Sequence, residues 1–407
     1  MIALLLPVAL AAEVYDGEMT RVDLGGDLKS FFLASFPYDH PLMPPDPTGQ
    51  GVFDARLRLD VRVAGRLKFE AHQSVTALAP AGGASFGLTQ SGVGRTAPEL
   101  VDLSWQAPED GGDTLLVRGR VDRLNLLARF NHLDLCLGRQ PITFGKTFFF
   151  TPMDLVNPFT PATIDTEYKP GVDALRADLF FGQDSLVTAA VAYAGSWDAD
   201  GLVAALYGQT TLGLWDLGVF GAMSHRDWVA GVATAGSAGP VGLRGELTAT
   251  LPPEGEDPFL RAAVGGDVRP TDRLSLSSEL YVQTLGAKDP ADYLSTYTNE
   301  RFARGELWAA GRYYGALAVG VQIAPTLNGS LAAIGNLADP SAMLSGSLAW
   351  SVSDNADFAA GFYYGLGKRP ADLELAQLLD PVAVSGAIRS EFGLLPATAF
   401  AQLRMYF

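Results

Sequence analysis

Apolar and polar residues alternate with a period of two along most of this chain. The stretch FDARLRLDVRV, residues 53–63, has Ala, Leu and Val on one parity and Asp and Arg on the other. Successive side chains of a β-strand point to opposite faces, so this pattern predicts strands with one apolar and one polar face. It recurs in LDLCLGR, RLSLSSELYVQ and AMLSGSLAW, while Gly and Pro interrupt every candidate for a long helix. We therefore expect an all-β protein.

The links between these segments alternate in length, which predicts how the strands are connected. Short turns such as Ala64-Gly65 and Asn131-His132 alternate with long polar stretches, as in barrels of bacterial outer membranes. The pattern indicates a single closed antiparallel transmembrane barrel of about 18 strands, with about 16 as the alternative and both termini in the periplasm. Residues 302–311 are interpreted as a short helical piece of a loop. The expected long outer loops are 34–51, 78–117, 143–171, 286–311 and 367–393.

The N-terminal residues resemble a secretory signal. MIALLLPVALAA has an apolar core followed by Ala9-Leu10-Ala11, which suits signal peptidase. Residues 1–11 are therefore predicted to be a signal peptide, and residues 12–407 the barrel. The usual Lys or Arg near the start is missing, and a buried N-terminal strand is the alternative.

The final segment, AFAQLRMYF, has the same alternation. Leu403, Met405 and Phe407 share one parity, and a terminal Phe preceded by apolar residues at every second position resembles the insertion signal of outer-membrane proteins. This resemblance implies that the barrel-insertion machinery recognises these three residues. A last strand paired with the first would also leave no unpaired backbone groups facing lipid.

Residues 137–181 carry a more specific resemblance. GRQPITFG leads into a stretch rich in Pro and Phe, and the chain returns through PGVDALR. This arrangement is similar to porin-like outer-membrane proteins of Gram-negative bacteria, some of which are close to alginate-export barrels. The resemblance implies a channel for small polar or anionic solutes. The alternative is an exit duct for a secreted exopolysaccharide, which would add periplasmic export components as partners.

The stretch 143–171 is the third outward loop in this strand count, the loop that general porins fold into the barrel. Prolines at 152, 158 and 161 stiffen it, and a run of Phe could anchor it against the wall. We expect it to narrow the lumen; a lid outside the barrel is the alternative. The charged residues expected to face the pore are Lys146, Asp154, Asp165, Glu167 and Lys169.

The polar face of the early strands is rich in Arg and Lys, although the chain has a net charge of −16. Such an arc would favour anions inside the pore; a ladder of salt bridges that only solvates the interior is the alternative. Near Asp122 the alternation slips by one residue, which predicts a β-bulge and leaves open which way Arg118 and Arg120 face. The predicted pore-lining residues are Arg56, Arg58, Arg62, Lys68, Arg123, Arg129 and Arg176.

The sequence has no signature of an enzyme. The four His residues are not part of a nucleophile motif, and no phosphate loop or nucleotide fingerprint is present. The single Cys136 disfavours a disulfide or a Cys-rich metal site. We therefore expect no catalytic residues, cofactor, metal or nucleic-acid partner. The expected partners are outer-membrane lipid and lipopolysaccharide, which the acidic outer loops would face.

Overall fold

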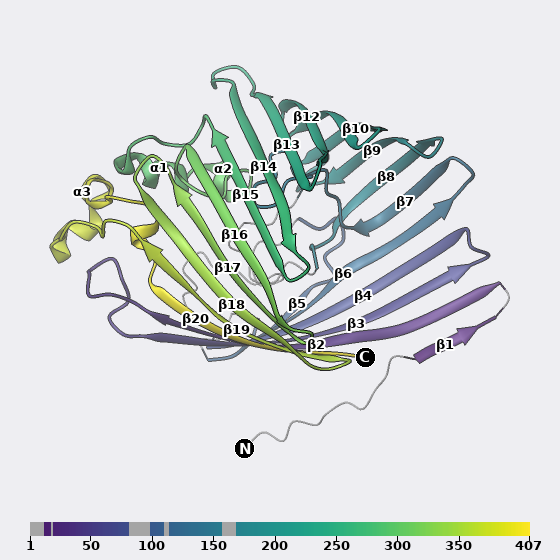
Figure 1. Cartoon of the computed structure of the whole chain (residues 1–407), viewed down its shortest axis with the longest axis horizontal. Coiled ribbons are helices and arrows are strands. Elements are labelled where there is room, and N and C mark those ends of the chain that lie inside the picture. The colour runs from purple at the N-terminus through teal and green to yellow at the C-terminus, as the bar shows by residue number, and fades with distance from the viewer. Residues whose placement is uncertain (1–11, 18, 81–97, 110–113, 157–167) are drawn as a thin grey trace.

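The computed structural model describes residues 12–17, 19–80, 98–109, 114–156 and 168–407. They form a closed antiparallel β-barrel of 18 strands, so the predicted fold class and the larger strand count are confirmed (Figure 1). The predicted signal peptide, residues 1–11, lies outside the described residues. In chain order the barrel strands are β2 (Thr20–Phe36), β3 (Thr48–Val63), β4 (Leu67–Ala79), β6 (Leu116–Arg129), β7 (Leu133–Gln140), β8 (Val172–Phe181), β9 (Ser185–Tyr193), β10 (Leu202–Leu212), β11 (Trp215–Ser224), β12 (Asp227–Ala238), β13 (Val241–Leu251), β14 (Phe259–Thr271), β15 (Leu274–Gln283), β16 (Tyr313–Ala324), β17 (Leu327–Asn336), β18 (Ser341–Ser353), β19 (Ala356–Leu366) and β20 (Ala397–Tyr406).

The barrel closes where β20 pairs with β2. Beyond the last strand pair, Gly26 and Phe407 exchange two backbone hydrogen bonds, with N–O distances of 2.7 and 3.0 Å. A Cβ atom on Gly26 would lie 2.5 Å from the Phe407 ring, so this close approach requires glycine. The short strand β1 (Ala12–Asp16) pairs with the first residues of β2, on the edge that β20 leaves uncovered. The seam therefore has no long open edge.

Short turns join the strands at one end of the barrel, and the long connections lie at the other end. The described helical segments belong to these long connections, and none of them is long and apolar enough to cross a membrane. The helical piece predicted at residues 302–311 is helical only at residues 302 and 303, where α2 ends; residues 304–311 are not helical. The helical segments are η1 (Pro290–Asp292), α1 (Tyr293–Tyr297), α2 (Glu300–Ala303), η2 (Leu375–Leu379), α3 (Pro381–Ala387) and η3 (Phe392–Leu394).

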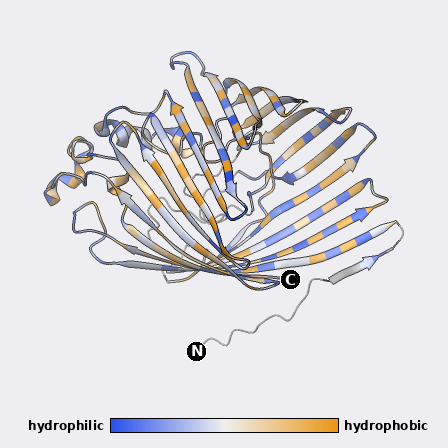
Figure 2. Cartoon of the chain, viewed as in Figure 1, coloured by the Kyte–Doolittle hydropathy of each residue, from blue (hydrophilic) through white to orange (hydrophobic). Residues whose placement is uncertain are grey.

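The outward face of the strands is apolar, as the alternation predicted. Figure 2 shows hydrophobic and hydrophilic residues following one another along the strands. Leu206, Val219 and Leu317 are 57, 66 and 61% exposed on three different strands. At ~25 cal/mol per Å² of apolar area, so large an exposed surface would be costly in water. A surface of this kind is stable when hydrocarbon covers it, which is the arrangement of transmembrane barrels.

The strand β6 contains the predicted bulge. His72 of β4 pairs with Arg123, whereas Gln73 pairs with Val121, so Asp122 is an extra residue on β6. Beyond the bulge, Arg118 and Arg120 lie opposite Thr76 and Ser74, which are buried on the inner face of β4. Both arginines therefore belong to the inner face of the barrel.

The outer part of β6 extends beyond its neighbour β7. Only residues 124–129 of β6 pair with β7, and the short strand β5 (Trp105–Ala107) pairs with residues 117–119. Between these two pairings, Arg139 donates to the carbonyl oxygens of Val121 and Val101, at 2.9 and 3.1 Å. The guanidinium thus takes the place of strand N–H donors, and the segment that contains β5 covers an otherwise open edge.

Candidate functional site: the barrel lumen

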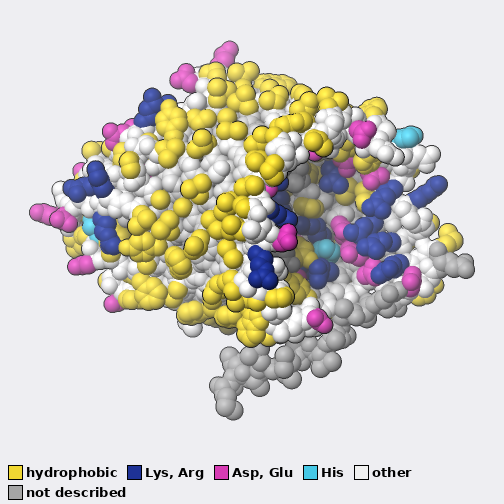
Figure 3. All heavy atoms as spheres, viewed as in Figure 1, with side chains coloured by type: hydrophobic (Ala, Val, Ile, Leu, Met, Phe, Trp, Pro, Cys, Tyr) yellow, Lys and Arg dark blue, Asp and Glu magenta, His cyan; other side chains and the backbone are white. Residues whose placement is uncertain are grey.

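The inner face of β2, β3, β4 and β6 carries charged side chains in rows that cross the strands. Figure 3 shows the opening of the barrel, where Lys, Arg, Asp, Glu and a His line the wall on the side of these strands. The strand register gives the rows, which alternate in sign along the barrel axis. Starting from the short-turn end they are Arg21, Arg62 and Lys68, then Asp23, Asp60 and Glu70, then Arg58, His72 and Arg123.

Besides Arg56, which is described below, four of the predicted pore-lining residues form ion pairs. Arg62 lies 3.5 Å from Asp23, and Lys68 contacts Glu70 directly. On neighbouring strands, Arg176 pairs with Asp178 at 3.0 Å, and Arg129, near a short turn, lies 3.7 Å from Asp134. These four residues therefore form the ion pairs expected of a salt-bridge ladder, which was the alternative to an anion-selecting arc.

Three further arginines on this wall have no carboxylate within ion-pair distance among the described residues. Arg58 donates to the Tyr168 hydroxyl and to the Gly26 carbonyl oxygen at 3.2 Å. Arg123 donates to the carbonyl oxygens of Asp122 and Lys169. Arg118 is exposed on the inner face. Within the described part of the chain, no carboxylate directly neutralises their positive charges.

Arg56 is buried beside the returning end of the 143–171 loop. It forms an ion pair with Asp122, and its guanidinium lies 4.2 Å from the centre of the Tyr168 ring. The Lys29 ammonium is 5.4 Å from the same ring. These cation–π contacts hold Tyr168 against the basic wall.

The first part of the same loop contacts the opposite wall through two carboxylates. Glu246 of β13 accepts hydrogen bonds from Thr147 N and Met153 N, at 2.8 and 3.0 Å. Glu279 of β15 accepts from Phe148 N and Phe150 N, both at 2.8 Å. The described part of the loop therefore lies inside the barrel, between the two walls.

Apolar packing accompanies these hydrogen bonds. Phe150 stacks on Tyr281 with 4.7 Å between ring centres. Phe144 and Met153 belong to one core cluster with small inner-face residues of β8 to β12, such as Ala190 and Ala222. Small side chains on this wall leave room for the loop.

The charges of the loop have specific partners. Lys169 Nζ lies 2.6 Å from Asp154 Oδ2, and both side chains are buried. Burial raises the pKa of the Asp154 carboxyl and lowers the pKa of the Lys169 ammonium, while each group opposes the shift of the other. This pair is shielded from the lumen, in contrast to the prediction that it faces the pore. Lys146 lies 3.6 Å from Asp216, and Asp165 and Glu167 lie outside the described residues.

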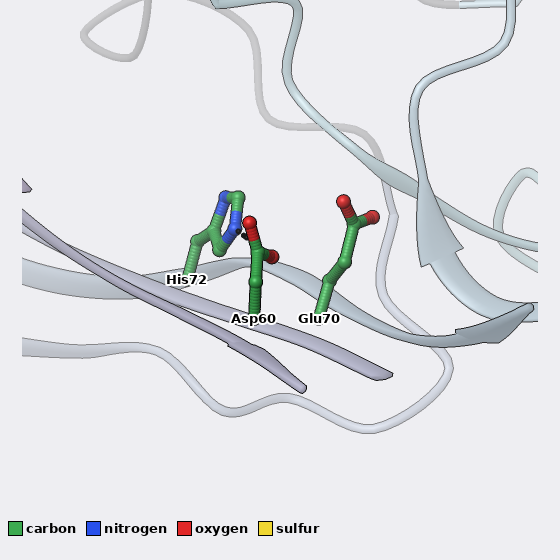
Figure 4. Close-up of side chains that lie close together, drawn as sticks. All are labelled: Asp60, Glu70 and His72. Carbon is green, nitrogen blue, oxygen red and sulfur yellow. Dashed lines mark hydrogen bonds and ion pairs between the residues drawn. The ribbon is translucent and has the colours of Figure 1, made fainter. Parts of the chain in front are cut away.

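Asp60, Glu70 and His72 form a compact cluster on this wall (Figure 4). One potential ligand atom of each lies within 4.8 Å of the others, close enough to surround a metal ion. However, the Lys68 ammonium contacts Glu70, and His72 Nε2 is 3.3 Å from Asp60. The adjacent rows are basic, so these carboxylates already have cationic neighbours. We assign the cluster to the ion pairs of the wall.

The comparisons with known proteins concern the fold. No family model and no curated protein sequence matches the chain. Among solved structures, OccAB2 of Acinetobacter baumannii is similar with a TM-score of 0.57 and 10% identity, over 95% of this chain and 98% of OccAB2. OccAB1 of the same organism has a TM-score of 0.55 and 12% identity, over 94% of this chain and 96% of OccAB1. The chain shares the fold of these barrels. OpdK of Pseudomonas aeruginosa, crystallised with vanillate, has a TM-score of 0.55 and 8% identity, over 95% of this chain and 98% of OpdK.

Some residues that shape the lumen were not predicted from the sequence. Glu246 and Glu279 are the single acidic residues of β13 and β15, and both are buried on the inner face. That isolated position is a sequence signal, but their bonding partners are backbone groups of the loop, which have no signature in the sequence. Tyr168 was missed because its partners Arg56 and Arg58 are more than a hundred residues away in the chain.

Proposed function

We propose that this protein is an outer-membrane channel through which small polar solutes, anions in particular, diffuse along the basic wall of the barrel. The apolar outer band supports a location in the membrane. The short turns would face the periplasm, with both termini on that side. OpdK was crystallised with vanillate, a small carboxylate, which is consistent with a solute of this class. No catalytic function is proposed.

The observation that carries this proposal is a set of three arginines, Arg58, Arg118 and Arg123, that have no carboxylate partner among the described residues. Charges separated by more than ~8 Å are largely screened at physiological ionic strength, so a solute responds to the charges beside it rather than to the net charge of −16. Guanidinium groups bind carboxylate and phosphate oxygens well. The basic wall would therefore raise the local concentration of anions.

Reversal potentials across a salt gradient in planar bilayers test the proposal. The wild-type channel should prefer anions, and replacing Arg58, Arg118 and Arg123 together by Ala should greatly weaken that preference. The matched control is Arg176→Ala with Asp178→Asn, which removes an ion pair without changing the net charge. A cation preference in the wild type, or an anion preference that survives the triple substitution, would contradict the proposal.

The polysaccharide duct is not proposed as a second function. The described part of the 143–171 loop contacts both Glu279 on one wall and Arg123 on the other. A loop that crosses the lumen in this way suits small solutes better than a continuous polymer.

A further inference from the structure

We infer that Glu246 and Glu279 are positioning residues that hold the first part of the 143–171 loop across the lumen and thereby set the aperture of the pore. This inference rests on the proposed channel function and deepens it. The aperture would be the space between the loop and the basic wall formed by β2, β3, β4 and β6.

The two carboxylates engage a continuous run of loop backbone. Glu246 Oε1 accepts from the N–H groups of Lys146 and Thr147 and from the Thr147 hydroxyl, and its Oε2 accepts from Met153 N. Glu279 accepts from the next three N–H groups, those of residues 148, 149 and 150. Five successive N–H groups thus point at two acidic side chains. Successive backbone N–H groups directed at one place form an anion-binding concavity.

In the described part of the chain, the negative charges of these two carboxylates are stabilised by the loop and not by a cation. Glu246 and Glu279 are 3 and 1% exposed, and no described Lys, Arg or His lies within ion-pair distance of either. A buried carboxylate without water or a cation requires hydrogen-bond donors. Here the loop backbone and the Thr147 hydroxyl supply them. If the loop moved away, two charged groups would remain unpaired on the inner wall.

The local packing fixes the same arrangement. A Cβ atom on Gly145 would lie 2.8 Å from Thr151 Cβ and 3.5 Å from Glu246 Oε1, so the chain turns tightly beside the carboxylate. Phe148 lies under the Arg244 guanidinium, 3.8 Å from the ring centre. The aromatic contacts fix the loop side chains, and the two carboxylates fix its backbone.

The anchored segment also places the rest of the loop. Asp154 follows Met153 directly and is paired with Lys169, whose carbonyl oxygen accepts from Arg123 on the basic wall. The position of the loop against β13 and β15 is therefore transmitted to the face of the loop that lies toward the arginines. Glu246 and Glu279 act on the aperture through the loop and have no direct contact with a solute in this arrangement.

Single-channel conductance of the full-length protein in planar bilayers tests the inference, with KCl as the permeating salt. Glu246→Gln and Glu279→Gln preserve side-chain size but replace one acceptor oxygen with an amide that cannot accept from the loop N–H groups. The double variant should change the conductance about twofold or increase the current noise, because the loop no longer has one fixed position in the pore. Glu300→Gln, on an exposed carboxylate outside the lumen, is the control and should match the wild type.

A double-mutant cycle separates an effect through the loop from a general change in the barrel. Residues 147–153 are deleted in the wild type and in the double variant, and all proteins are first shown to resist SDS without heating. If the carboxylates act through the loop, the Gln substitutions should have no further effect once the segment is removed. Additive effects, or a folded double variant with wild-type conductance and noise, would overturn the inference. A wild-type protein that forms no conducting pore would instead refute the proposed function.

Discussion

At the scale of single residues, a break in the alternation of apolar and polar residues predicted a local feature of the backbone. The slip near Asp122 predicted a bulge, and the register between β4 and β6 confirms it. The bulge has a clear role, since the Asp122 carboxylate pairs with Arg56 and its carbonyl oxygen accepts from Arg123. The pairing of Asp154 with Lys169 could not be predicted in the same way, because no local pattern specifies which loop charges meet.

The pair of Asp154 and Lys169 leads to a stability prediction. Asp154→Asn leaves the buried Lys169 ammonium without its charged partner, and breaking a buried pair in this way costs about 3–5 kcal/mol. The combined Asp154→Asn and Lys169→Met variant removes both charges and should recover most of that loss. The measurement is the free energy of unfolding of detergent-solubilised protein in guanidinium chloride. Equal stability of the single variant and the wild type would show that water reaches the pair.

At the scale of elements, the strands were predictable and the loop interior was not. Period two determined the strands because one face meets an apolar environment and the other the polar lumen. The helical piece of the 286–311 loop was predicted too late in the chain, since α1 and α2 depend on contacts between loops, such as the hydrogen bond of Tyr297 with Glu391. The short strand β5 was missed because it covers only the edge of β6 that β7 leaves open, and three residues carry no visible period.

The attachment of β5 depends on Arg139, which gives a prediction at this scale. Arg139 donates to the Val101 carbonyl oxygen and pairs with Glu99 and Asp173, both at 2.9 Å. Arg139→Gln removes these ion pairs, so the segment with β5 should detach more often and become sensitive to proteases. Chymotrypsin should cleave near Leu103 and Trp105 several times faster than in the wild type, as measured by mass spectrometry of the fragments. Arg129→Gln, which alters an exposed ion pair at the opposite end of the barrel, is the control.

If the cleavage rates of the Arg139→Gln variant and the wild type are the same, the pairing of β5 with β6 is sufficient to hold the segment. The result is informative only for protein that still resists SDS before heating, because a disrupted barrel would be cleaved at many sites.

At the scale of the whole molecule, two properties matter: the charge of the lumen and the closure of the barrel. The chain is acidic overall, yet the wall of β2, β3, β4 and β6 carries arginines that have no carboxylate partner in the described ranges, so net charge is a poor guide to the lumen. Closure depends on one seam between strands that are far apart in the chain. There β20 pairs with β2 from Tyr406 to Ala397, and Phe407 extends the contact to Gly26.

The seam allows the role of Phe407 in closure to be separated from its predicted role as an insertion signal. Deleting Phe407 removes both backbone hydrogen bonds to Gly26 together with the ring, whereas Phe407→Ala removes the ring alone. The deletion should lower both the amount of barrel in the outer membrane and the temperature at which the barrel unfolds in SDS. The reason is that the backbone N–H and carbonyl groups of Gly26 would lose their partners on Phe407. Phe407→Ala should lower the membrane yield while changing the unfolding temperature much less, if the insertion machinery recognises the ring. Leu375→Ala, on an exposed loop side chain, is the control for both measurements. If both Phe407 variants reach the membrane in wild-type amounts, the insertion-signal prediction is wrong. If the deletion leaves the unfolding temperature unchanged, β20 and β2 close the barrel without the contact between Phe407 and Gly26.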